Sequence, residues 1–370
     1  MNRGIRDIRG IGSIKGVTGV NLPALRSHNA ALVLDLLRTA GEGGISRIEL
    51  ADGTGLTPQA VSKITARLRD EGLVAEAGRR ASTGGRPGTA LCLVPSAGHA
   101  VGLHLDRDEV TAVLLDLAGT PVAVGAGPLD LGAGSEAVVE KVAAEVEALT
   151  GGGARVLGVG VAMPGPLDHG TGVAHRVTGF PAWDGFPLRD ALAARLGLGV
   201  VLDKDTNAAA LGLALRGAGE SFAYLHLGTG LGAGLVLAGA LYRGARTGAG
   251  EFGHQVIQLD GPPCGCGRRG CIEALCLGAV GAGDLDRAAR VLGVGAANLV
   301  ELLDIDRVLL GGRIVAADPE PFVRGVGERV RIPVALAEGA AQVVAEGAAQ
   351  LVLAPVFGRA EAASAAPKIG

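Results

Sequence analysis

The sequence has 370 residues, which is long enough for more than one domain with a core of its own. Apolar residues make up 48% and charged residues 19% of it. No apolar run approaches the roughly 18 residues that span a bilayer, so we expect no membrane-spanning function. The N-terminal stretch MNRGIRDIRGIGSIKG lacks the continuous apolar segment of a secretory signal. We therefore expect a cytoplasmic protein with reduced cysteines.

The net charge of −3 hides an asymmetry along the chain. Residues 1–95 hold 13 Lys and Arg against 8 Asp and Glu, a net charge of +5, whereas residues 96–370 hold 21 against 29, a net charge of −8. A basic first part on an acidic body indicates that only the first part meets a polyanion. We expect a flexible tail over 1–20, a DNA-binding domain over 21–95 and an effector domain over 96–370.

The basic part has the pattern of a winged helix-turn-helix. Apolar residues recur at three- and four-residue spacing over Leu25–Ala40 and predict a first helix. A short second helix fits Ser46–Asp52, and in TPQAVSKITARLRDEGL we expect Thr57 to cap a third helix that begins with proline. Two short strands, near Leu73–Ala75 and Ala90–Val94, enclose a loop rich in Gly and Arg and supply the wing.

The third helix and the wing hold the side chains expected at DNA. Gln and Ser hydrogen-bond base edges, Lys and Arg reach phosphates or guanine, and an Arg held between Gly and Pro fits a narrow minor groove. The alternative is a small helical bundle with a charged, solvated face. We expect salt-dependent contacts with operator DNA. The candidate residues are Thr57, Gln59, Ser62, Lys63, Arg67 and Arg86.

From residue 96 onward, strand-like and helix-like segments alternate. AVGLHL and VTAVLLDLAGTPV predict paired strands, GSEAVVEKVAAEVEALT an amphipathic helix, and VVLDKDTNAAALGLAL a strand that continues into a helix. FAYLHLGTGLGAGLVLAGALY predicts two strands joined by a glycine turn, and RVLLGGRIV a strand with a Gly-Gly turn. Such alternation indicates an α/β architecture with mostly buried sheets.

Six signatures follow one another in the body: MPGPLD, DTNAAALG, LGTGLGAGLV, GAGEFGH, CGCGRRGCIEA and VLLGG. In this order they resemble the ROK family (repressor, open reading frame, kinase). The resemblance covers residues 21–370, because many ROK repressors carry a winged helix-turn-helix in front. It implies a two-lobed α/β body of the hexokinase and actin type, with a ribonuclease H-like fold, behind an α+β winged helix-turn-helix domain.

The cysteines form a compact motif. Cys264, Cys266 and Cys271 have C-x-C-x4-C spacing, and His254 lies ten residues before the first of them. Three thiolates and an imidazole match the ligand set of a closed tetrahedral zinc site. The alternative is a reduced cluster without metal, although the resemblance marks these same four positions as a structural Zn²⁺ site.

The resemblance also implies a sugar beside this metal. A metal-bound imidazole keeps a second nitrogen for a ligand, and the family binds sugar hydroxyls through this histidine and two glutamates, here His254, Glu251 and Glu273. Asp205 stands at the position of the family's kinase base. Lys204 replaces a sugar-binding Asn of the family. Either it pairs with Asp205 and silences the base, or it admits an anionic sugar derivative.

The phosphate cradle of the family's kinases is half present. The second Gly-rich hairpin, Leu227–Gly234, is intact, whereas the first has HLDRD over His104–Asp108 in place of D-x-G-G-T. Asp106 and Asp108 would face phosphate with like charge, and one such pair at about 4 Å costs about 4 kcal/mol at an effective dielectric constant of about 20. His104 replaces an aspartate that helps to hold the metal–nucleotide. We therefore expect no catalytic residue and no kinase activity.

These features favour a DNA-binding regulator, which we expect to repress carbohydrate metabolism genes. We expect a homodimer that binds two operator half-sites and responds to a sugar or sugar derivative in its cleft. One alternative is an ATP-dependent sugar kinase with an appended DNA-binding head. Another is a regulator that answers to a protein partner and keeps a vestigial pocket. The segment after Glu273 is shorter than the family pattern, so we expect part of the helical roof of one lobe to be absent.

Overall fold

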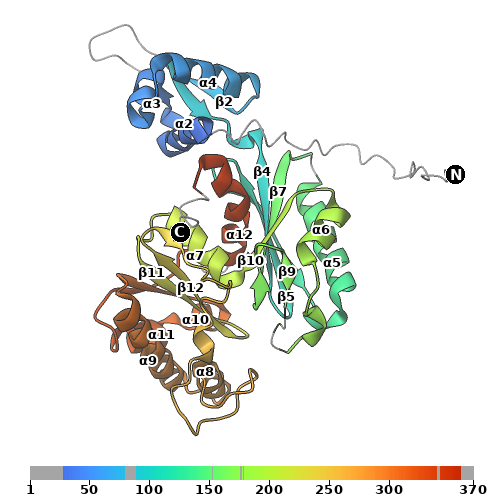
Figure 1. Ribbon diagram of the computed structural model, residues 1–370, viewed down its shortest axis with the longest axis vertical. Coiled ribbons are helices and arrows are strands. Elements are labelled where there is room, and N and C mark those ends of the chain that lie inside the picture. The colour runs from blue at the N-terminus through green and yellow to red at the C-terminus, as the bar shows by residue number, and fades with distance from the viewer. Residues whose placement is uncertain are drawn as a thin grey trace, which may run out of the picture.

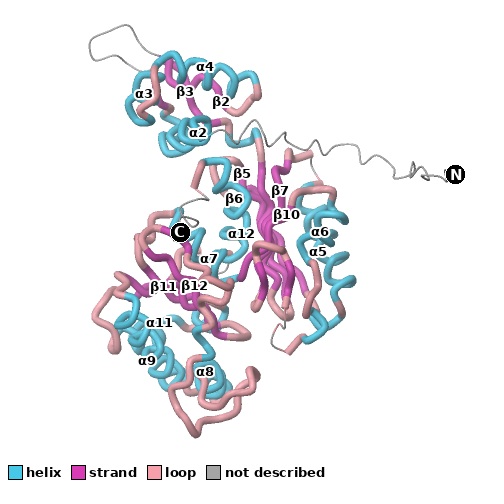
Figure 2. The backbone as a smooth tube through the Cα atoms, viewed as in Figure 1, coloured by secondary structure: helices cyan, strands magenta, loops and turns pink. Residues whose placement is uncertain are grey.

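The computed structural model describes residues 28–79, 89–151, 153–175, 177, 179–339 and 342–359. These residues form a small N-terminal head on a body of two lobes (Figure 1), and each lobe is built on one β-sheet (Figure 2). The tail expected over 1–20 and the wing residue Arg86 lie outside the described residues. No helix in the described part of the chain has the length and apolar character needed to cross a membrane.

The head has the three helices and the two wing strands that the sequence predicts, whereas the loop between those strands lies outside the described residues. Its elements are α2 (His28–Ala40), β1 (Ile45–Ser46), α3 (Arg47–Thr54), α4 (Pro58–Asp70), β2 (Val74–Arg79) and β3 (Thr89–Leu93). The Ser46 hydroxyl accepts from the Glu49 amide and the Glu49 carboxylate accepts from the Ser46 amide, which closes a capping box at α3. The strands pair antiparallel in the order β1-β3-β2. Strand β2 is longer than expected, because its pairing with β3 continues through a bulge to Arg79.

The first lobe is a sheet of order β10-β7-β4-β5-β6. Its strands are β4 (His99–Leu105), β5 (Glu109–Asp116), β6 (Pro121–Pro128), β7 (Val156–Met163) and β10 (Val200–Lys204), and its flanking helices are α5 (Ser135–Thr150) and α6 (Leu188–Leu196). Small elements complete it: β8 (Leu167–Asp168) and β9 (Val173–Ala174). Because β4, β7 and β10 are parallel, their carboxyl ends meet at one edge, which is where ligands bind in open α/β sheets.

The second lobe is a sheet of order β13-β12-β11-β14-β15. Its elements are β11 (Phe222–Leu227), β12 (Leu231–Leu237), β13 (Ala240–Leu241), α8 (Ile272–Gly281), α9 (Leu285–Leu303), β14 (Arg307–Gly311), α10 (Arg313–Ala317), α11 (Pro319–Gly327) and β15 (Val334–Leu336). Helices α8, α9 and α11 pack together over one face of the sheet. The short segment after Glu273 is α8 itself, which a three-residue turn joins directly to α9.

Two helices lie between the sheets. Helix α7 (Asp205–Leu215) follows β10, and α12 (Val343–Leu353) packs on β4, β7 and β5 as well as on α7. The helices cross in direct backbone contact, because a Cβ at Gly347 would collide with the carbonyl group of Ala208. A Cβ at Gly160 of β7 would likewise collide with the carbonyl group of Ala348. The crossing therefore requires glycine and leaves the two helices little room to move independently.

The head and the body share one hydrophobic core. After α12, the 3₁₀ segment η6 (Ala354–Phe357) turns under the head, where Phe357 is 4% exposed. The cluster that contains Leu34 and Leu37 of α2 also contains Leu353 and Phe357. The Arg38 guanidinium lies 5.0 Å from the centre of the Phe357 ring. The last described turn of the body is thus built into the core of the head.

Candidate functional site

The third helix of the head presents a polar face to solvent. Val61 and Leu68 of α4 are fully buried, whereas the helix side that points away from the core is exposed. The Thr57 hydroxyl accepts from the Ala60 amide at 3.2 Å, so this residue caps the helix as expected. The exposed candidates for DNA contact are Thr57, Gln59, Ser62, Lys63 and Arg67.

The four expected metal ligands converge. One ligand atom from each of His254, Cys264, Cys266 and Cys271 lies within 4.8 Å of the others. The Cys266 and Cys271 sulfurs are 3.7 Å apart, and His254 Nδ1 lies 3.7 Å from the Cys264 sulfur. Ligand atoms about 2.0 to 2.3 Å from a tetrahedral zinc ion would be separated by about 3.5 to 3.8 Å. The donor set and its spacing therefore fit such an ion.

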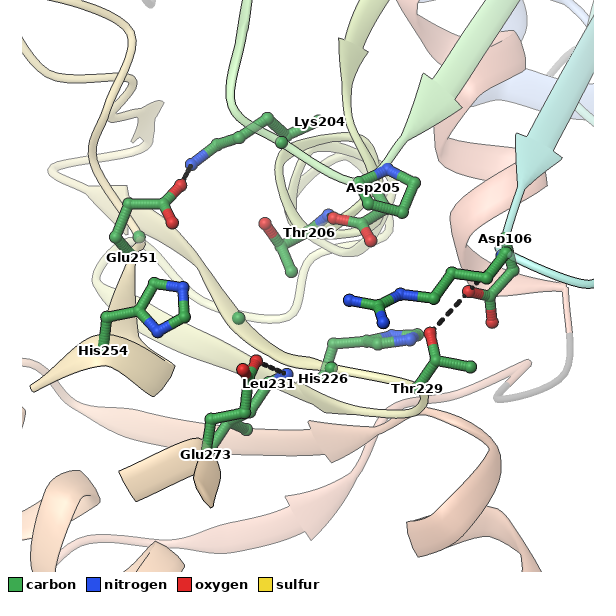
Figure 3. Close-up of a pocket in the computed structure, with 16 residues that line it drawn as sticks. Asp106, Lys204, Asp205, Thr206, His226, Thr229, Leu231, Glu251, His254 and Glu273 are labelled. Carbon is green, nitrogen blue, oxygen red and sulfur yellow. Dashed lines mark hydrogen bonds and ion pairs between the residues drawn. The ribbon is translucent and has the colours of Figure 1, made fainter. Parts of the chain in front are cut away.

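A pocket opens between the lobes beside this cluster (Figure 3). Lys204 and Asp205 enter it from the end of β10 and the start of α7, and Glu251, His254 and Glu273 enter it from the second lobe. The structure thus brings together all five side chains that the sequence analysis nominated for ligand binding. They belong to three separate chain segments, 204–205, 251–254 and 273, which only the meeting of the lobes makes adjacent.

Lys204 binds Glu251 in the structure. Its side chain is 4% exposed, and its Nζ donates to the Ala249 carbonyl group and lies 3.2 Å from Glu251 Oε1. Its stem passes so close to Gly165 that a Cβ there would lie 2.8 Å from Lys204 Cδ. The Lys204 ammonium group is therefore satisfied by two acceptors of the second lobe rather than by its sequence neighbour Asp205.

Glu273 connects the metal cluster to the pocket. It lies in the first turn of α8, and its Oε2 accepts from the Leu231 amide at 2.9 Å. Its Oε1 lies 3.9 Å from the Cys264 sulfur. His254 directs Nδ1 toward that same sulfur, which leaves Nε2 for a ligand. A metal in the cluster would therefore hold one wall of the pocket in place.

Asp205 is partly buried at the first residue of α7. Burial raises the pKa of its carboxyl group above the ordinary value, although nearby His226 opposes that shift. Its Oδ1 accepts from the Thr206 amide at 2.6 Å. His226 lines the same pocket, and its Nδ1 lies 2.9 Å from the hydroxyl of the fully buried Tyr224. Asp205 is thus placed to accept a hydrogen bond from a hydroxyl group in the pocket.

The first hairpin contacts the second lobe at two points. Asp106 Oδ1 accepts from the Thr229 hydroxyl at 2.7 Å and from the Arg107 amide at 2.8 Å (Figure 3). Burial disfavours the ionised form of Asp106, but these hydrogen bonds outweigh it, and the pKa lies below its ordinary value. Asp108 accepts from Arg313 Nη1 at 2.9 Å and 3.0 Å, just after the VLLGG turn. Protein groups therefore join the two hairpins directly.

His104 lies in a second cavity of roughly 380 Å³, which Asp106, His226 and Arg313 also line. Burial, followed by the nearby His226, lowers the pKa of His104 from 6.5 to about 4. Its Nε2 is buried without a hydrogen-bond partner in the described structure. The ring is therefore neutral at physiological pH, and it supplies no negative charge for a metal–nucleotide.

The sequence analysis missed several contributors to the pocket, which include Thr206 and His226 as well as Arg107 and Thr229. HLDRD was interpreted for the glycines that it lacks, for the charges of Asp106 and Asp108 and for His104, so the cation at its fourth position went unused. Thr229 lies between two glycines of LGTGLGAG, a hairpin that was interpreted only for its backbone.

The fold and the site define a class of protein: a two-lobed sugar-kinase-like body with an interlobe pocket, a Cys₃His cluster and a winged helix-turn-helix head. Family models agree, since "ROK family" matches residues 100–282 and "Winged helix-turn-helix DNA-binding" matches residues 33–75. The chain is 32% identical to a solved ROK hexokinase from Thermus thermophilus, over 68% of this chain and 96% of that chain, with a TM-score of 0.57. The chain belongs to the ROK family.

Curated relatives include repressors. The chain is 29% identical to the xylose repressor of Bacillus subtilis (strain 168), over 62% of this chain and 61% of that protein. It is 28% identical to the DNA-binding transcriptional dual regulator NagC of Escherichia coli (strain K12), over 69% of this chain and 64% of that protein. The chain thus spans less than two thirds of the length of these relatives. A solved ROK family transcriptional regulator, described as a homolog of the E. coli MLC protein, shares the fold at 21% identity and a TM-score of 0.75 over 92% of this chain and 98% of that chain.

Proposed function

We propose that this protein is a DNA-binding transcriptional regulator, a repressor in the manner of the xylose repressor and NagC, whose operator affinity depends on a sugar or sugar derivative in the interlobe pocket. The side chains that would bind the effector are Lys204, Asp205, Glu251, His254 and Glu273. Carboxylates that converge from two lobes accept hydrogen bonds from neighbouring hydroxyl groups, which is the pattern a polyol ligand requires.

One observation carries the proposal: the pocket and the head are joined through packed helices. Asp205 is the first residue of α7, α7 crosses α12 at Gly347 and Ala208, and α12 continues into η6 inside the head. A ligand that shifts the start of α7 would displace α12, and with it the orientation of α4. Couplings between two sites are typically 1–3 kcal/mol, which corresponds to roughly 5- to 150-fold in operator affinity.

Zn²⁺ is the metal that we assign to His254, Cys264, Cys266 and Cys271. Its closed four-ligand coordination suits a structural role, because no position remains open for a reacting water. The ion would brace both His254 and the start of α8, which carries Glu273, so that both side chains keep their places in the pocket.

We propose that the protein does not transfer phosphate. Glycines that would let a nucleotide approach are replaced by Asp106 and Arg107, and Asp106 is already bonded to Thr229 of the opposite hairpin. Asp108 is likewise bonded to Arg313. A nucleotide would have to break these contacts and place its phosphates beside two carboxylates. A kinase with an appended head is therefore the weaker interpretation of this site.

A homodimer follows from the form of operator recognition. Winged helix-turn-helix proteins read two half-sites with two symmetry-related heads, so the change that a ligand makes in one head is repeated in the other. We propose that the exposed polar face of α4, with Gln59, Ser62 and Lys63, enters the major groove.

The test is a titration of operator fragments, selected from genomic DNA by binding to the purified protein, with and without sugars. We expect nanomolar binding that falls steeply as salt rises, and a shift of at least fivefold on addition of the correct sugar. Absence of sequence preference would contradict DNA regulation. Sequence-specific binding that no sugar changes would leave a regulator that answers to another signal.

A further inference from the structure

The charged side chains of the pocket are satisfied by protein partners, with one exception. Lys204 binds Glu251, Asp106 accepts from Thr229, and the other carboxylates accept from backbone amides. Arg107 lines the same pocket, yet no hydrogen bond or ion pair of its guanidinium group occurs within the described structure.

The position of Arg107 is defined on three sides. Its guanidinium carbon lies 5.8 Å from the centre of the Phe180 ring. A Cβ at Gly179 would lie 4.0 Å from Nη1, and a Cβ at Gly230 would lie 3.9 Å from Nη2. The group therefore spans the cleft from the first lobe to the glycine hairpin of the second. Its Nε is shielded from solvent and has no acceptor among the described residues.

A cation with a desolvated N–H donor and no acceptor costs free energy, unless a bound ligand supplies the missing acceptor. The planar guanidinium fork matches two oxygens of a phosphate or carboxylate group, and such charge-assisted pairs are shorter and stronger than neutral hydrogen bonds. Building on the proposed function, we propose that Arg107 is the anion receptor of the effector pocket, and that the effector is a sugar that carries an oxyanion, either a phosphate ester or a carboxylate.

This assignment gives the contact with an anionic ligand to Arg107 and not to Lys204. Lys204 was a candidate for contacting an anionic ligand, but its ammonium group is already held by Glu251 and Ala249. Arg107 is the pocket cation left for that task. An oxyanion bound to Arg107 would also lie next to the Gly230 backbone. Its binding would therefore draw the two hairpins together, and this closure of the lobes would shift α7.

The carboxylates of the pocket would repel an anionic ligand, but contacts within the structure reduce that repulsion. Asp106 keeps its charge but is turned to Thr229, and Glu251 is balanced by Lys204. Burial favours the neutral form of Asp205. Glu273 is the remaining carboxylate among the residues that line the pocket, and its Oε2 accepts from the Leu231 amide.

The experiment measures binding of matched sugars to the full chain by calorimetry: D-glucose, D-glucose 6-phosphate and D-glucuronate, and then N-acetylglucosamine with its 6-phosphate. In the wild type we expect at least one anionic member to bind tenfold or more tightly than its neutral parent. In Arg107→Gln we expect that ratio to fall to about one, because the donor remains while the charge is removed. The preference should also weaken as ionic strength rises.

A matched variant locates the effect. Arg324→Gln, an exposed arginine outside the pocket lining, should keep the wild-type ratio. Neutral sugars that bind as tightly as their anionic partners in the wild type would overturn the assignment. So would an anion preference that survives Arg107→Gln. Binding of none of these sugars would instead count against the proposed sugar-responsive function itself.

Discussion

Asp35 of the head and Arg359 of the body form an ion pair, with Arg359 Nη2 2.8 Å from Asp35 Oδ2. The two residues are 324 positions apart in sequence. The pair lies at the end of the path that leads from α7 through α12 to α2, on the side of the shared core where Arg38 covers Phe357. It adds a charged contact to the hydrophobic core that joins the head to the body.

The ion pair should transmit part of the ligand effect. Arg359→Gln is expected to reduce the ratio of operator affinities with and without effector by threefold or more, while effector affinity alone changes little. The reason is that the head would keep its fold but lose one anchor to η6. Fluorescence anisotropy on labelled operator measures the ratio, and a double-mutant cycle with Asp35→Asn tests whether the two side chains act together. An unchanged ratio in Arg359→Gln would remove this pair from the path.

The bond between Asp106 and Thr229 should contribute to stability in a pH-dependent way. Thr229→Val removes the donor and is expected to lower the free energy of unfolding by about 1 to 2 kcal/mol at pH 7. Because the folded pKa of Asp106 is depressed, its contribution is present above about pH 4 and is lost as the pH falls through the folded pKa. The difference between wild type and variant in urea unfolding should therefore shrink in acid. A difference that is constant with pH would contradict the assigned partner.

The metal cluster should hold one structural zinc ion. Cys266→Ser is expected to lower the zinc content of purified protein, measured by mass spectrometry of the element, and to lower Tm. A loss of about 3 kcal/mol in the free energy of unfolding would lower Tm by roughly 6 to 12 °C in a domain of this size. Cys276→Ser is the matched control, because that thiol is buried beside Ala288 and outside the cluster. Full zinc content in Cys266→Ser would show that the metal lies elsewhere.

The polar face of α4 should divide into side chains that bind phosphates and side chains that bind bases. Lys63→Ala is expected to weaken binding on all sequences and to reduce the slope of log K against log salt by about 0.9, because one phosphate fewer is neutralised. Gln59→Ala should instead cost about 1–3 kcal/mol on the preferred operator and much less on mismatched sites. Equal weakening on specific and random DNA in both variants would contradict the expected orientation of the helix.

The protein should not consume ATP in the presence of sugar. A coupled assay for ADP with glucose, xylose and N-acetylglucosamine is expected to give background rates, and Asp205→Asn should leave those rates unchanged. Steady ADP formation that disappears in Asp205→Asn would establish the kinase that we set aside, and would show that Asp106 and Thr229 separate during turnover.

The sequence predicted the organisation of this protein to a large extent, for local reasons. The capping box at Ser46 and the cap at Thr57 determine where helices begin, because a side chain three residues away satisfies the free amide. Three of the five cysteines lie within eight residues, so that one tight loop is enough to gather three of the four metal ligands. The order of the glycine-rich signatures indicated the family, and membership of that family implied the two-lobed fold.

Tertiary structure decided the partners of the charged residues. Lys204 adjoins Asp205 in sequence, but its side chain reaches Glu251 because β10 ends where the second lobe closes over it. Arg107 was interpreted as a lost glycine, and only the approach of Gly179 and Gly230 places its guanidinium group in the pocket. The junction of head and body depends on α12 returning from the far end of the chain. Sequence patterns of period 2 and 3.6 predict which face of a strand or helix is buried. They do not indicate which charged side chain from a distant part of the chain will contact that element.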